Sequence, residues 1–333
     1  MSNTRSGHSD PTISCVVTKR VPLYYEEGAD VNVDRPRHVR SGSAVVWLNT
    51  RKRLAVIQDD ASFIALVDPK TARATSEILP WQHEGQRQFD AMRGNKAMKL
   101  DLEACVCVSL NDELDRMIAF GSGSSPMREK IVVADVTATT FDVQIVDAHA
   151  LYETFRQRVG FSGSELNIEG ACIVGGTLRL FQRGNGMANE ASMPVDATCD
   201  LDLERFLSFL EAPEALEPPE LENVHVYDLG ALQNTRYTFT DATMHNGTLY
   251  FLAAAEASPN ATDDGPVVGT ALGVATDDAT FVTPITDEDG KPFLVKVEGL
   301  VANPFVEGEF FIVTDRDDPS EPAELCTLSV TMA

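Results

Sequence analysis

The stretch DLEACVCVSL, residues 101–110, decides how the whole chain is interpreted. It opens with a polar residue, an apolar residue, a carboxylate and a small residue, and then continues as an apolar run. The run does not alternate between apolar and polar residues, so it predicts a strand that is buried on both faces. Other segments with the same opening are therefore candidates for equivalent buried strands.

Five segments share this opening at a spacing of roughly 60 to 70 residues, which is longer than a compact propeller repeat. They read S-G-S-A at 41–44, D-L-E-A at 101–104, N-I-E-G at 167–170, T-F-T-D at 238–241 and K-V-E-G at 296–299. The first and fourth copies are degenerate, since Gly42 stands where the others are apolar and Asp241 where they are small. Each opening leads into a strand, a turn and a second strand that ends in polar residues.

This period leaves room for four strands in each unit, and it predicts an all-β fold, a five-bladed β-propeller, with six blades as the alternative. After the last opening only about 35 residues remain, enough for three strands. The run from Ile13 to Tyr25 is therefore expected to supply the missing outer strand and close the ring. We expect one propeller domain over residues 1–333, with 1–12 as a flexible tail.

Two segments interrupt the strand pattern with helical periodicity. Residues 148–159 place Leu151, Tyr152 and Phe155 on one face, and residues 201–210 form a second apolar helix that Asp200 is expected to cap. Both segments are interpreted as packing elements of the propeller rather than as a separate domain.

The composition of the chain excludes several classes of function. The chain carries 27 Lys and Arg against 51 Asp and Glu, a net charge of −24, which would repel nucleic acid and anionic lipid. No apolar stretch reaches the length of a membrane helix, and the polar start contains no export signal, so a cytoplasmic location is expected. The six cysteines lack a disulfide or CxxC pattern and are expected to be reduced. No oligomeric state is indicated.

The third residues of the five openings form the predicted metal site. Five inner strands around a narrow axis would bring these side chains together at one height. They are Ser43, Glu103, Glu169, Thr240 and Glu298. Three neighbouring carboxylates repel one another unless a cation lies between them, and an all-oxygen ring suits Ca²⁺ better than Mg²⁺ or zinc. The alternative is a metal-free ring in which the glutamates accept hydrogen bonds from backbone amides.

Several segments carry a resemblance to known families. DLEACV, SELNIEGA, LFQRGNG, AAAEASPNATDDGPVVG and KVEGL resemble an uncharacterised bacterial propeller family, a domain of unknown function, from Arg40 onward. The Glu-Gly strand starts are similar to phytase-like propellers, and the order Ser, Glu, Glu, Thr, Glu is similar to the five-bladed calcium-activated nucleotidases (apyrases). That last resemblance implies an axial Ca²⁺ held by the five residues above and hydrolysis of nucleoside di- and triphosphates, with Thr240 standing where that family has serine.

Polar residues at the strand starts and tips are expected to line the mouth above the metal. Besides the residues assigned below, they include Asp59, Asp60, Asn185, Glu256 and Asp317. Turn formation alone also explains polar residues at such positions.

We predict a catalytic set of Asp101, Asn167, Arg183, Lys296 and Asp315. Arg183 and Lys296, with Arg128, would bind an anionic phosphate, and Asp101 or Asp315 would orient an attacking metal-bound water. The predicted function is a calcium-dependent hydrolase of small phosphoric esters or anhydrides, with lactones or carboxylic esters as neighbouring substrates. The alternative is a non-enzymatic ligand- or protein-binding propeller in which the cation is structural.

Overall fold

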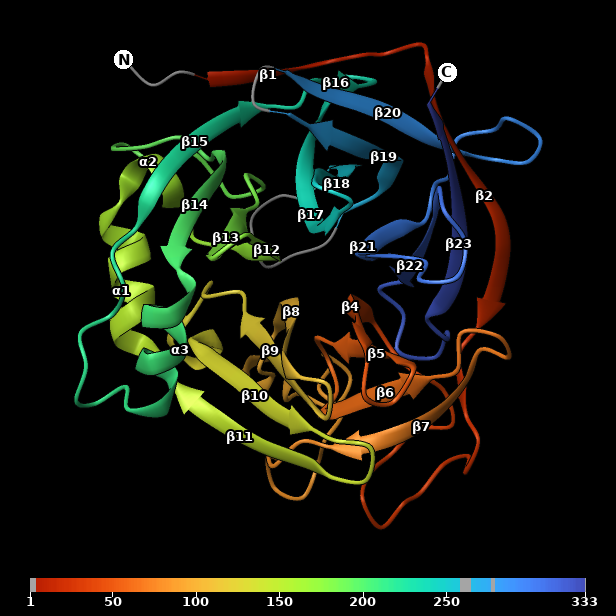
Figure 1. The fold of residues 1–333 in the computed structure, drawn as a ribbon, viewed down its shortest axis with the longest axis vertical. Coiled ribbons are helices and arrows are strands. Elements are labelled where there is room, and N and C mark those ends of the chain that lie inside the picture. The colour runs from red at the N-terminus through yellow and green to blue at the C-terminus, as the bar shows by residue number, and fades with distance from the viewer. Residues whose placement is uncertain (1–3, 258–264, 277–278, 333) are drawn as a thin grey trace.

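The computed structural model describes residues 4–257, 265–276 and 279–332. Residues 1–3 of the expected tail and 258–264 of the segment AAAEASPNATDDGPVVG lie outside the described residues. Strands dominate, and Figure 1 shows them arranged as a ring around a central axis. The predicted all-β, propeller-like fold is confirmed.

Hydrogen bonding within the described residues arranges most strands in five antiparallel groups of four, which we number along the chain from the group that contains β4. The inner strands are β4 (Gly42–Leu48), β8 (Leu102–Asn111), β12 (Ile168–Val174), β17 (Thr235–His245) and β21 (Lys296–Ala302). The second strands are β5 (Arg53–Gln58), β9 (Leu114–Gly121), β13 (Thr177–Gln182), β18 (Thr248–Glu256) and β22 (Glu309–Asp315). The third strands are β6 (Phe63–Val67), β10 (Lys130–Val136), β14 (Asp196–Asp202), β19 (Val267–Ala275) and β23 (Glu324–Met332). The outer strands are β7 (Arg73–Ile78), β11 (Phe141–Asp147), β15 (Glu222–Asp228), β20 (Thr280–Asp287) and β2 (Ile13–Pro22).

The inner strands form a closed cycle of contacts. β4 contacts β8, β8 contacts β12, β12 contacts β17, β17 contacts β21, and β21 returns to β4. Five apolar clusters fill the spaces between neighbouring groups; one of them, for example, joins Phe120 and Ile131 of the second group to Leu180 and Cys199 of the third. The buried faces of adjacent groups therefore stabilise the ring, and the strand starts are held close to the axis.

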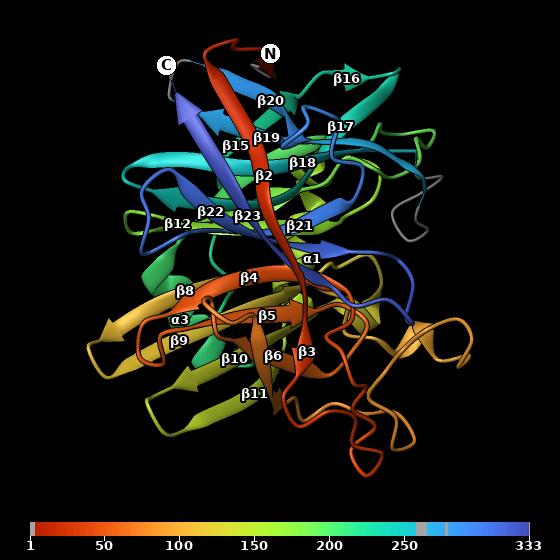
Figure 2. The ribbon, with the colours of Figure 1, turned by 90° about the vertical axis from the view of Figure 1, so that its right-hand side faces the viewer.

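The N-terminal segment closes the ring, as the sequence predicts from Ile13 onward. β2 pairs antiparallel with β23, and the two strands lie side by side in Figure 2. The expectation of a flexible tail over 1–12 is wrong for Thr4–His8, which form β1 and pair in parallel with both β15 and β20. β1 forms backbone hydrogen bonds with the outer strands of two strand groups, which explains why this segment is ordered. β3 (Tyr24–Tyr25) pairs with β7.

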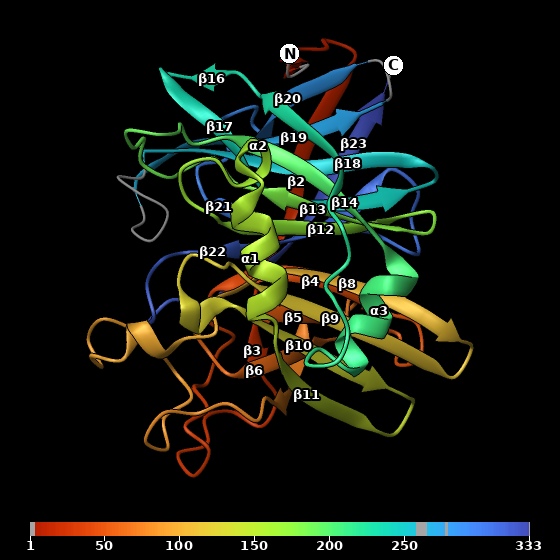
Figure 3. The same ribbon diagram turned by 90° about the vertical axis from the view of Figure 1, so that its left-hand side faces the viewer.

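Helices cover one side of the ring, as Figure 3 shows. α1 (His149–Gln157) buries Leu151, Tyr152 and Phe155 as predicted, and α2 (Val159–Ser162) follows it. The second predicted helix is α3 (Leu203–Glu211), but its cap is Asp202, whose carboxylate accepts a hydrogen bond from the Arg205 amide at 2.8 Å. Asp200 lies in β14 instead, where it pairs with Arg179.

All six cysteines are unpaired, and five of them are buried. In the described part of the chain, every helix is too short or too polar to cross a bilayer.

Candidate functional site

The third residue of every repeat lies at a shift in strand register. In each inner strand, the pairing with the second strand skips the third residue of the repeat, and β8 skips Leu110 as well. The skipped third residues are Ser43, Glu103, Glu169, Thr240 and Glu298. A bulge of this kind leaves one residue out of the ladder and changes the direction of its side chain. The five residues of the predicted ring therefore occupy equivalent positions in the fold.

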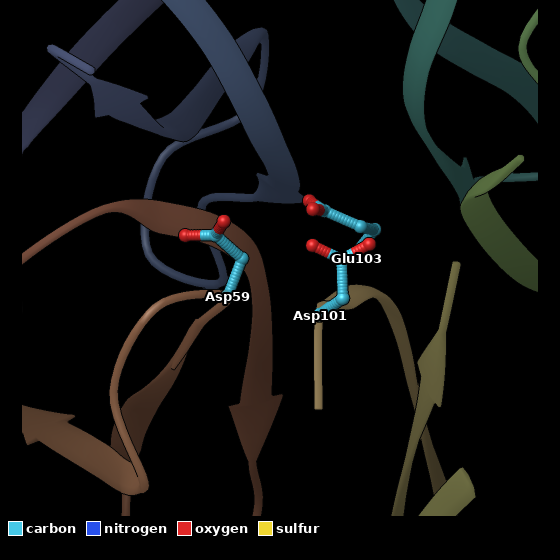
Figure 4. A group of neighbouring side chains, drawn as sticks. All are labelled: Asp59, Asp101 and Glu103. Carbon is cyan, nitrogen blue, oxygen red and sulfur yellow. The ribbon is translucent and has the colours of Figure 1, made fainter. Parts of the chain in front are cut away.

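The three glutamates of this set converge. Carboxylate oxygens of Glu103, Glu169 and Glu298 all lie within 4.8 Å of one another. Glu103 also belongs to a second group, with Asp59 and Asp101, in which the oxygens again lie within 4.8 Å of one another. Figure 4 shows this second group, in which Asp59 follows β5 and the other two carboxylates stand at the start of β8. Glu103 thus connects two sets of carboxylates.

The two hydroxyl residues of the predicted ring make hydrogen bonds between neighbouring inner strands. Ser43 Oγ donates to the Leu102 carbonyl at 2.6 Å, and Thr240 Oγ1 donates to the Val297 carbonyl at 2.8 Å. Each carbonyl belongs to the residue just before a converging glutamate. These hydroxyls therefore help to position the carboxylates, and their role as metal ligands stays a prediction.

Small residues after the bulges allow the inner strands to approach closely, as the sequence predicts. A Cβ atom at Gly299 would lie 2.8 Å from the Val45 amide nitrogen, and one at Gly170 would lie 3.0 Å from the Asp241 Cα. Real Cβ atoms do not tolerate backbone this close without displacement. In the degenerate fourth copy, the Asp241 carboxylate accepts a hydrogen bond from the Leu300 amide at 2.7 Å.

The carboxylates line a cavity of about 40 Å³ with an entirely polar and charged lining. Every residue of the predicted catalytic set lines this cavity: Asp101, Asn167, Arg183, Lys296 and Asp315. Asp59, Asn185 and Asp317 also line it, as does Arg128. Glu256 stands behind Arg183, and Asp60 faces an adjoining cavity. The volume leaves room for an ion with one or two waters, since each water needs about 10 to 15 Å³ by this measure.

One flank of the cavity is organised by a lysine that the sequence analysis missed. Lys99 Nζ lies 2.5 Å from both Asp59 Oδ2 and Asp101 Oδ1, and Arg128 lies 2.8 Å from Asp101 Oδ2. Burial disfavours the charge of Lys99, but the two aspartates outweigh burial and raise its pKa well above the usual value. The spacing of Lys99, Asp101 and Glu103 at every second residue was the available signal, although Lys99 and Asp101 precede β8.

The opposite flank is held by two further cations. Arg183 bonds Glu256 Oε2 at 2.5 Å and Glu169 Oε1 at 3.2 Å, and Lys296 Nζ lies 2.7 Å from Glu298 Oε1. The Asn167 amide donates to Glu169 Oε1 at 2.7 Å. Glu169 and Glu298 are therefore partly neutralised by side chains. Glu103, in contrast, makes no hydrogen bond or ion pair among the residues that the structure describes.

Burial and like charges shift the acidities of these groups. Burial, together with Asp59, Asp101 and the other two glutamates, raises the pKa of Glu103 well above its usual value. Burial likewise raises the pKa of Glu298 against the opposing effect of Lys296. Burial and the neighbouring Asp317 raise the pKa of Asp315 to about 7. The cavity therefore disfavours the full set of negative charges that would be present at neutral pH in water.

Asp101 behaves in the opposite way. Burial alone would raise its pKa, but Lys99 and Arg128 outweigh burial and lower the value to about 2. This carboxylate is therefore ionised throughout the neutral range, and it holds both cations in place.

A second buried arginine, Arg40, lies beside the site. Its Nε donates to Asp60 Oδ2 at 2.8 Å, its NH1 lies 3.2 Å from Asp90 Oδ2, and it is only 2% exposed. Burial and the neighbouring Asp59 raise the pKa of Asp60 to about 7 against the effect of Arg40. The adjoining cavity, of about 320 Å³, shares Asp59, Lys99, Asp315 and Asp317 with the axial one.

The fold and the site define a propeller-like all-β protein with carboxylates gathered at the axis. The chain belongs to a family of unknown function (DUF6929), whose profile matches residues 38–330. The predicted membership of an uncharacterised family is confirmed.

Comparison with solved structures finds likeness at low identity. Glutaminyl cyclase from Myxococcus xanthus is 9% identical, with 99% of this chain and 100% of that chain covered and a TM-score of 0.46. The calcium-binding protein regucalcin from Agrobacterium tumefaciens is 7% identical, with 94% and 97% covered and a TM-score of 0.42. A luciferin-regenerating enzyme is 9% identical, with 88% and 92% covered and a TM-score of 0.40. No curated protein matches the chain.

Proposed function

We propose that the five strand groups are the blades of a five-bladed propeller and that its axial carboxylates bind a divalent cation. The closed cycle of β4, β8, β12, β17 and β21 supports this blade count over the alternative of six. The N-terminal strand β2 completes the last blade in this interpretation. The cation would join blades that are far apart in the sequence.

The observation that carries the proposal is the position of Glu103. Its carboxylate belongs to both convergent groups, and no described residue neutralises it by an ion pair. Seven acidic and four basic side chains line the cavity, so an excess of negative charge is left. A divalent cation would remove this repulsion, because it lowers the cost of keeping neighbouring carboxylates ionised.

Calcium fits the donor set better than magnesium. Two oxygens bound to one Ca²⁺ at about 2.3 to 2.6 Å lie no more than about 5 Å apart, which matches the spread of Glu103, Glu169 and Glu298 oxygens. Magnesium demands a stricter octahedron and retains more water. The residues that would hold the ion are these three glutamates, with Ser43 and Thr240 as the remaining predicted ligands.

Calorimetry and thermal unfolding test this proposal on the full chain after EDTA treatment. We expect one Ca²⁺ per chain, weaker binding of Mg²⁺, and a rise in Tm of about 5 to 10 °C at saturating Ca²⁺. Glu103→Gln should abolish both effects, whereas the matched control Glu113→Gln, in an exposed turn, should retain them. Identical melting curves with Ca²⁺ and with EDTA, together with no heat of binding, would contradict a cation site.

Hydrolysis of a phosphoric ester or anhydride is the second candidate function. The observation in its favour is that Lys99, Arg128, Arg183 and Lys296 line the same cavity as the convergent carboxylates. Arg183 and Lys296 would bind phosphoryl oxygens after exchanging their carboxylate partners, and Asp315, with a pKa of about 7, would accept a proton. A bound Ca²⁺ would supply Lewis-acid polarisation of the phosphoryl group.

Release of inorganic phosphate from ATP, ADP and phytate, measured with Ca²⁺ and with EDTA, tests the hydrolase. Asp315→Asn should lower kcat by at least about 100-fold while preserving the Ca²⁺ effect on Tm. If no phosphate is released at high enzyme concentration but calorimetry still detects Ca²⁺, the protein is a binding propeller with a structural cation.

A further inference from the structure

The adjoining cavity lies where the first and fifth strand groups meet. Asp59 and Asp60 follow β5 of the first group, Asp315 ends β22 of the fifth, and residues 89–96 come from the connection between β7 and β8. Its volume is about 320 Å³, against about 40 Å³ for the axial cavity. The axial cavity admits an ion with one or two waters, whereas the adjoining one is large enough for a small organic molecule.

Negative charge predominates in the lining of the adjoining cavity. Six carboxylates line it against three cations, namely Asp59, Asp60, Asp90, Asp315, Asp317 and Asp318 against Arg40, Lys96 and Lys99. Arg40 is bonded to Asp60 and Asp90. Lys99 is bonded to Asp59. Two of the three cations are therefore held by carboxylates of the same cavity, and the excess of negative charge favours a positively charged ligand.

Two carboxylate oxygens of the lining residues lack a hydrogen-bond donor. Asp59 Oδ1 and Asp60 Oδ1 are buried, and no described residue donates a hydrogen bond to either atom. Asp60 as a whole is only 9% exposed. Buried acceptors of this kind are rare in folded proteins and cost free energy. A donor that enters from the cavity would satisfy them after a small rotation about χ2, a torsion with a broad minimum in Asp.

The spacing of the carboxylates separates an organic cation from a metal ion. Among the described residues, oxygens of three acidic side chains converge within 4.8 Å in two groups, and both groups contain Glu103. Glu103 does not line the adjoining cavity. A Ca²⁺ ion needs six to eight oxygens around one point. An ammonium group needs only acceptors for its three N–H donors, so it suits carboxylates that do not converge.

The rim of the adjoining cavity offers apolar contact. Ala91, Met92 and Pro319 belong to its lining, and Met92 is 82% exposed. Methionine is flexible and adapts to the shape of an apolar group. Carboxylates and apolar side chains in one cavity suit a ligand that carries a charged head on a short apolar chain.

We propose that the adjoining cavity binds a small aliphatic amine in its protonated form. The ammonium group would donate to Asp59 and Asp60, and the aliphatic chain would contact Met92 and Pro319 at the rim. This organic-cation site goes beyond the proposed axial Ca²⁺ site, because ten of its fourteen lining residues do not line the axial cavity.

Binding of n-hexylamine tests the proposal, with n-hexanol and hexanoate as the uncharged and negatively charged molecules of the same chain length. Calorimetric titration of the full chain in EDTA at pH 8, where the amine is protonated, gives a result that does not depend on axial Ca²⁺. We expect one saturable site for n-hexylamine, at least tenfold weaker binding of n-hexanol and no binding of hexanoate. Non-saturable heats, or equal affinities for n-hexylamine and n-hexanol, overturn the proposal.

Substitutions of opposite sign locate the bound amine. Ala91 is exposed, so Ala91→Lys adds a positive charge to the lining without disturbing the core and should weaken n-hexylamine binding by about threefold or more. The matched control Ala91→Gln should keep the affinity within about twofold. Lys96→Gln removes a cation from the lining and should strengthen binding by about threefold. Unchanged affinity in both Ala91→Lys and Lys96→Gln overturns the proposal.

A second pair of variants separates the two cavities. Asp60→Asn removes a proposed contact and should weaken n-hexylamine binding at least tenfold, whereas Glu169→Gln, in the axial cavity, should keep it within about threefold. If Asp60→Asn fails to fold, the comparison of Glu169→Gln with Ala91→Lys serves instead. Loss of binding in Glu169→Gln alone would place the amine in the axial cavity and overturn the proposal. Failure of the Ca²⁺ site leaves these titrations unchanged, because they are made in EDTA.

Discussion

The two ends of the central channel are built from the same five strands and have opposite chemistry. At the strand starts, eleven of the thirteen residues that line the cavity are charged: Asp59, Lys99, Asp101, Glu103, Arg128, Glu169, Arg183, Lys296, Glu298, Asp315 and Asp317. Further along the strands, no described charged side chain lines the second cavity of about 260 Å³. The bulged strand starts therefore gather the charged side chains at one end of the channel, the polar end, and leave the other end uncharged.

At the polar end, buried carboxylates repel one another, and neighbouring cations reduce this repulsion. Lys99 and Asp101 form a buried pair that requires both partners, and Glu103 remains without one among the described residues. The uncharged end has no such repulsion, because its described lining consists of apolar residues, cysteines, Asn49 and Thr243. Substitutions that change a charge should therefore affect the two ends differently, and substitutions that change a side-chain volume should affect both.

The largest expected effect follows from removing Lys99. Lys99→Met leaves the buried carboxylates of Asp59 and Asp101 without their shared cation, and we expect a loss of about 3 to 5 kcal/mol in the free energy of unfolding in EDTA. Urea unfolding measures this loss. The control Lys130→Met breaks a pair whose partner Asp147 is 66% exposed, and it should cost about 0 to 1 kcal/mol. Equal losses in the free energy of unfolding in the two variants would contradict the inference that ion pairs stabilise the polar end.

The second prediction concerns the close approach of the first and last inner strands, β4 and β21. Gly299→Ala places a Cβ atom 2.8 Å from the Val45 amide nitrogen, so it should destabilise the protein by about 1 to 3 kcal/mol through overpacking. Gly176→Ala is the matched control, because nothing lies within 4 Å of the added atom. Urea unfolding should show a lower midpoint for Gly299→Ala alone. A neutral result there would argue against tight contact between the first and last inner strands.

The third prediction is the pH dependence of stability in EDTA. The folded-state pKa of Asp315 is raised from 3.8 to about 7, so the folded state binds its proton more tightly than the unfolded state. This group therefore stabilises the fold at low pH, and that contribution is lost as pH rises from about 4 to about 7. Saturating Ca²⁺ should reduce the dependence, because the cation competes with protons. Thermal unfolding between pH 5 and pH 8 provides the measurement. A stability that rises through this window in EDTA would contradict the raised pKa of Asp315.

The repeat could be predicted from sequence because each copy encodes its own local structure. Glu103, Glu169 and Glu298 precede a small residue and an apolar strand, and the structure aligns all three at register shifts. The outer strand from Ile13 was also predictable, since the last unit lacked a fourth strand. These features depend on residues that are neighbours along the chain, or on the number of strands in each unit. Both can be determined from a single sequence.

Other parts of the site depend on contacts between residues far apart in the chain. Arg40 pairs with Asp90, and Arg183 with Glu256, and neither pair has a recognisable sequence spacing. The order of β1 also escaped prediction, because the edges that it satisfies belong to β15 and β20.

Sequence alone thus brought the oxygens of Glu103, Glu169 and Glu298 together through a short repeated pattern, whereas the hydroxyls of Ser43 and Thr240 bond neighbouring carbonyls. Only the assembled ring decided which of those oxygens are neutralised, because ion pairing depends on distances between strands that the chain brings together by closing. It also decided that the opposite end of the channel is hollow, since a cavity is a property of how five surfaces fit and of no single segment.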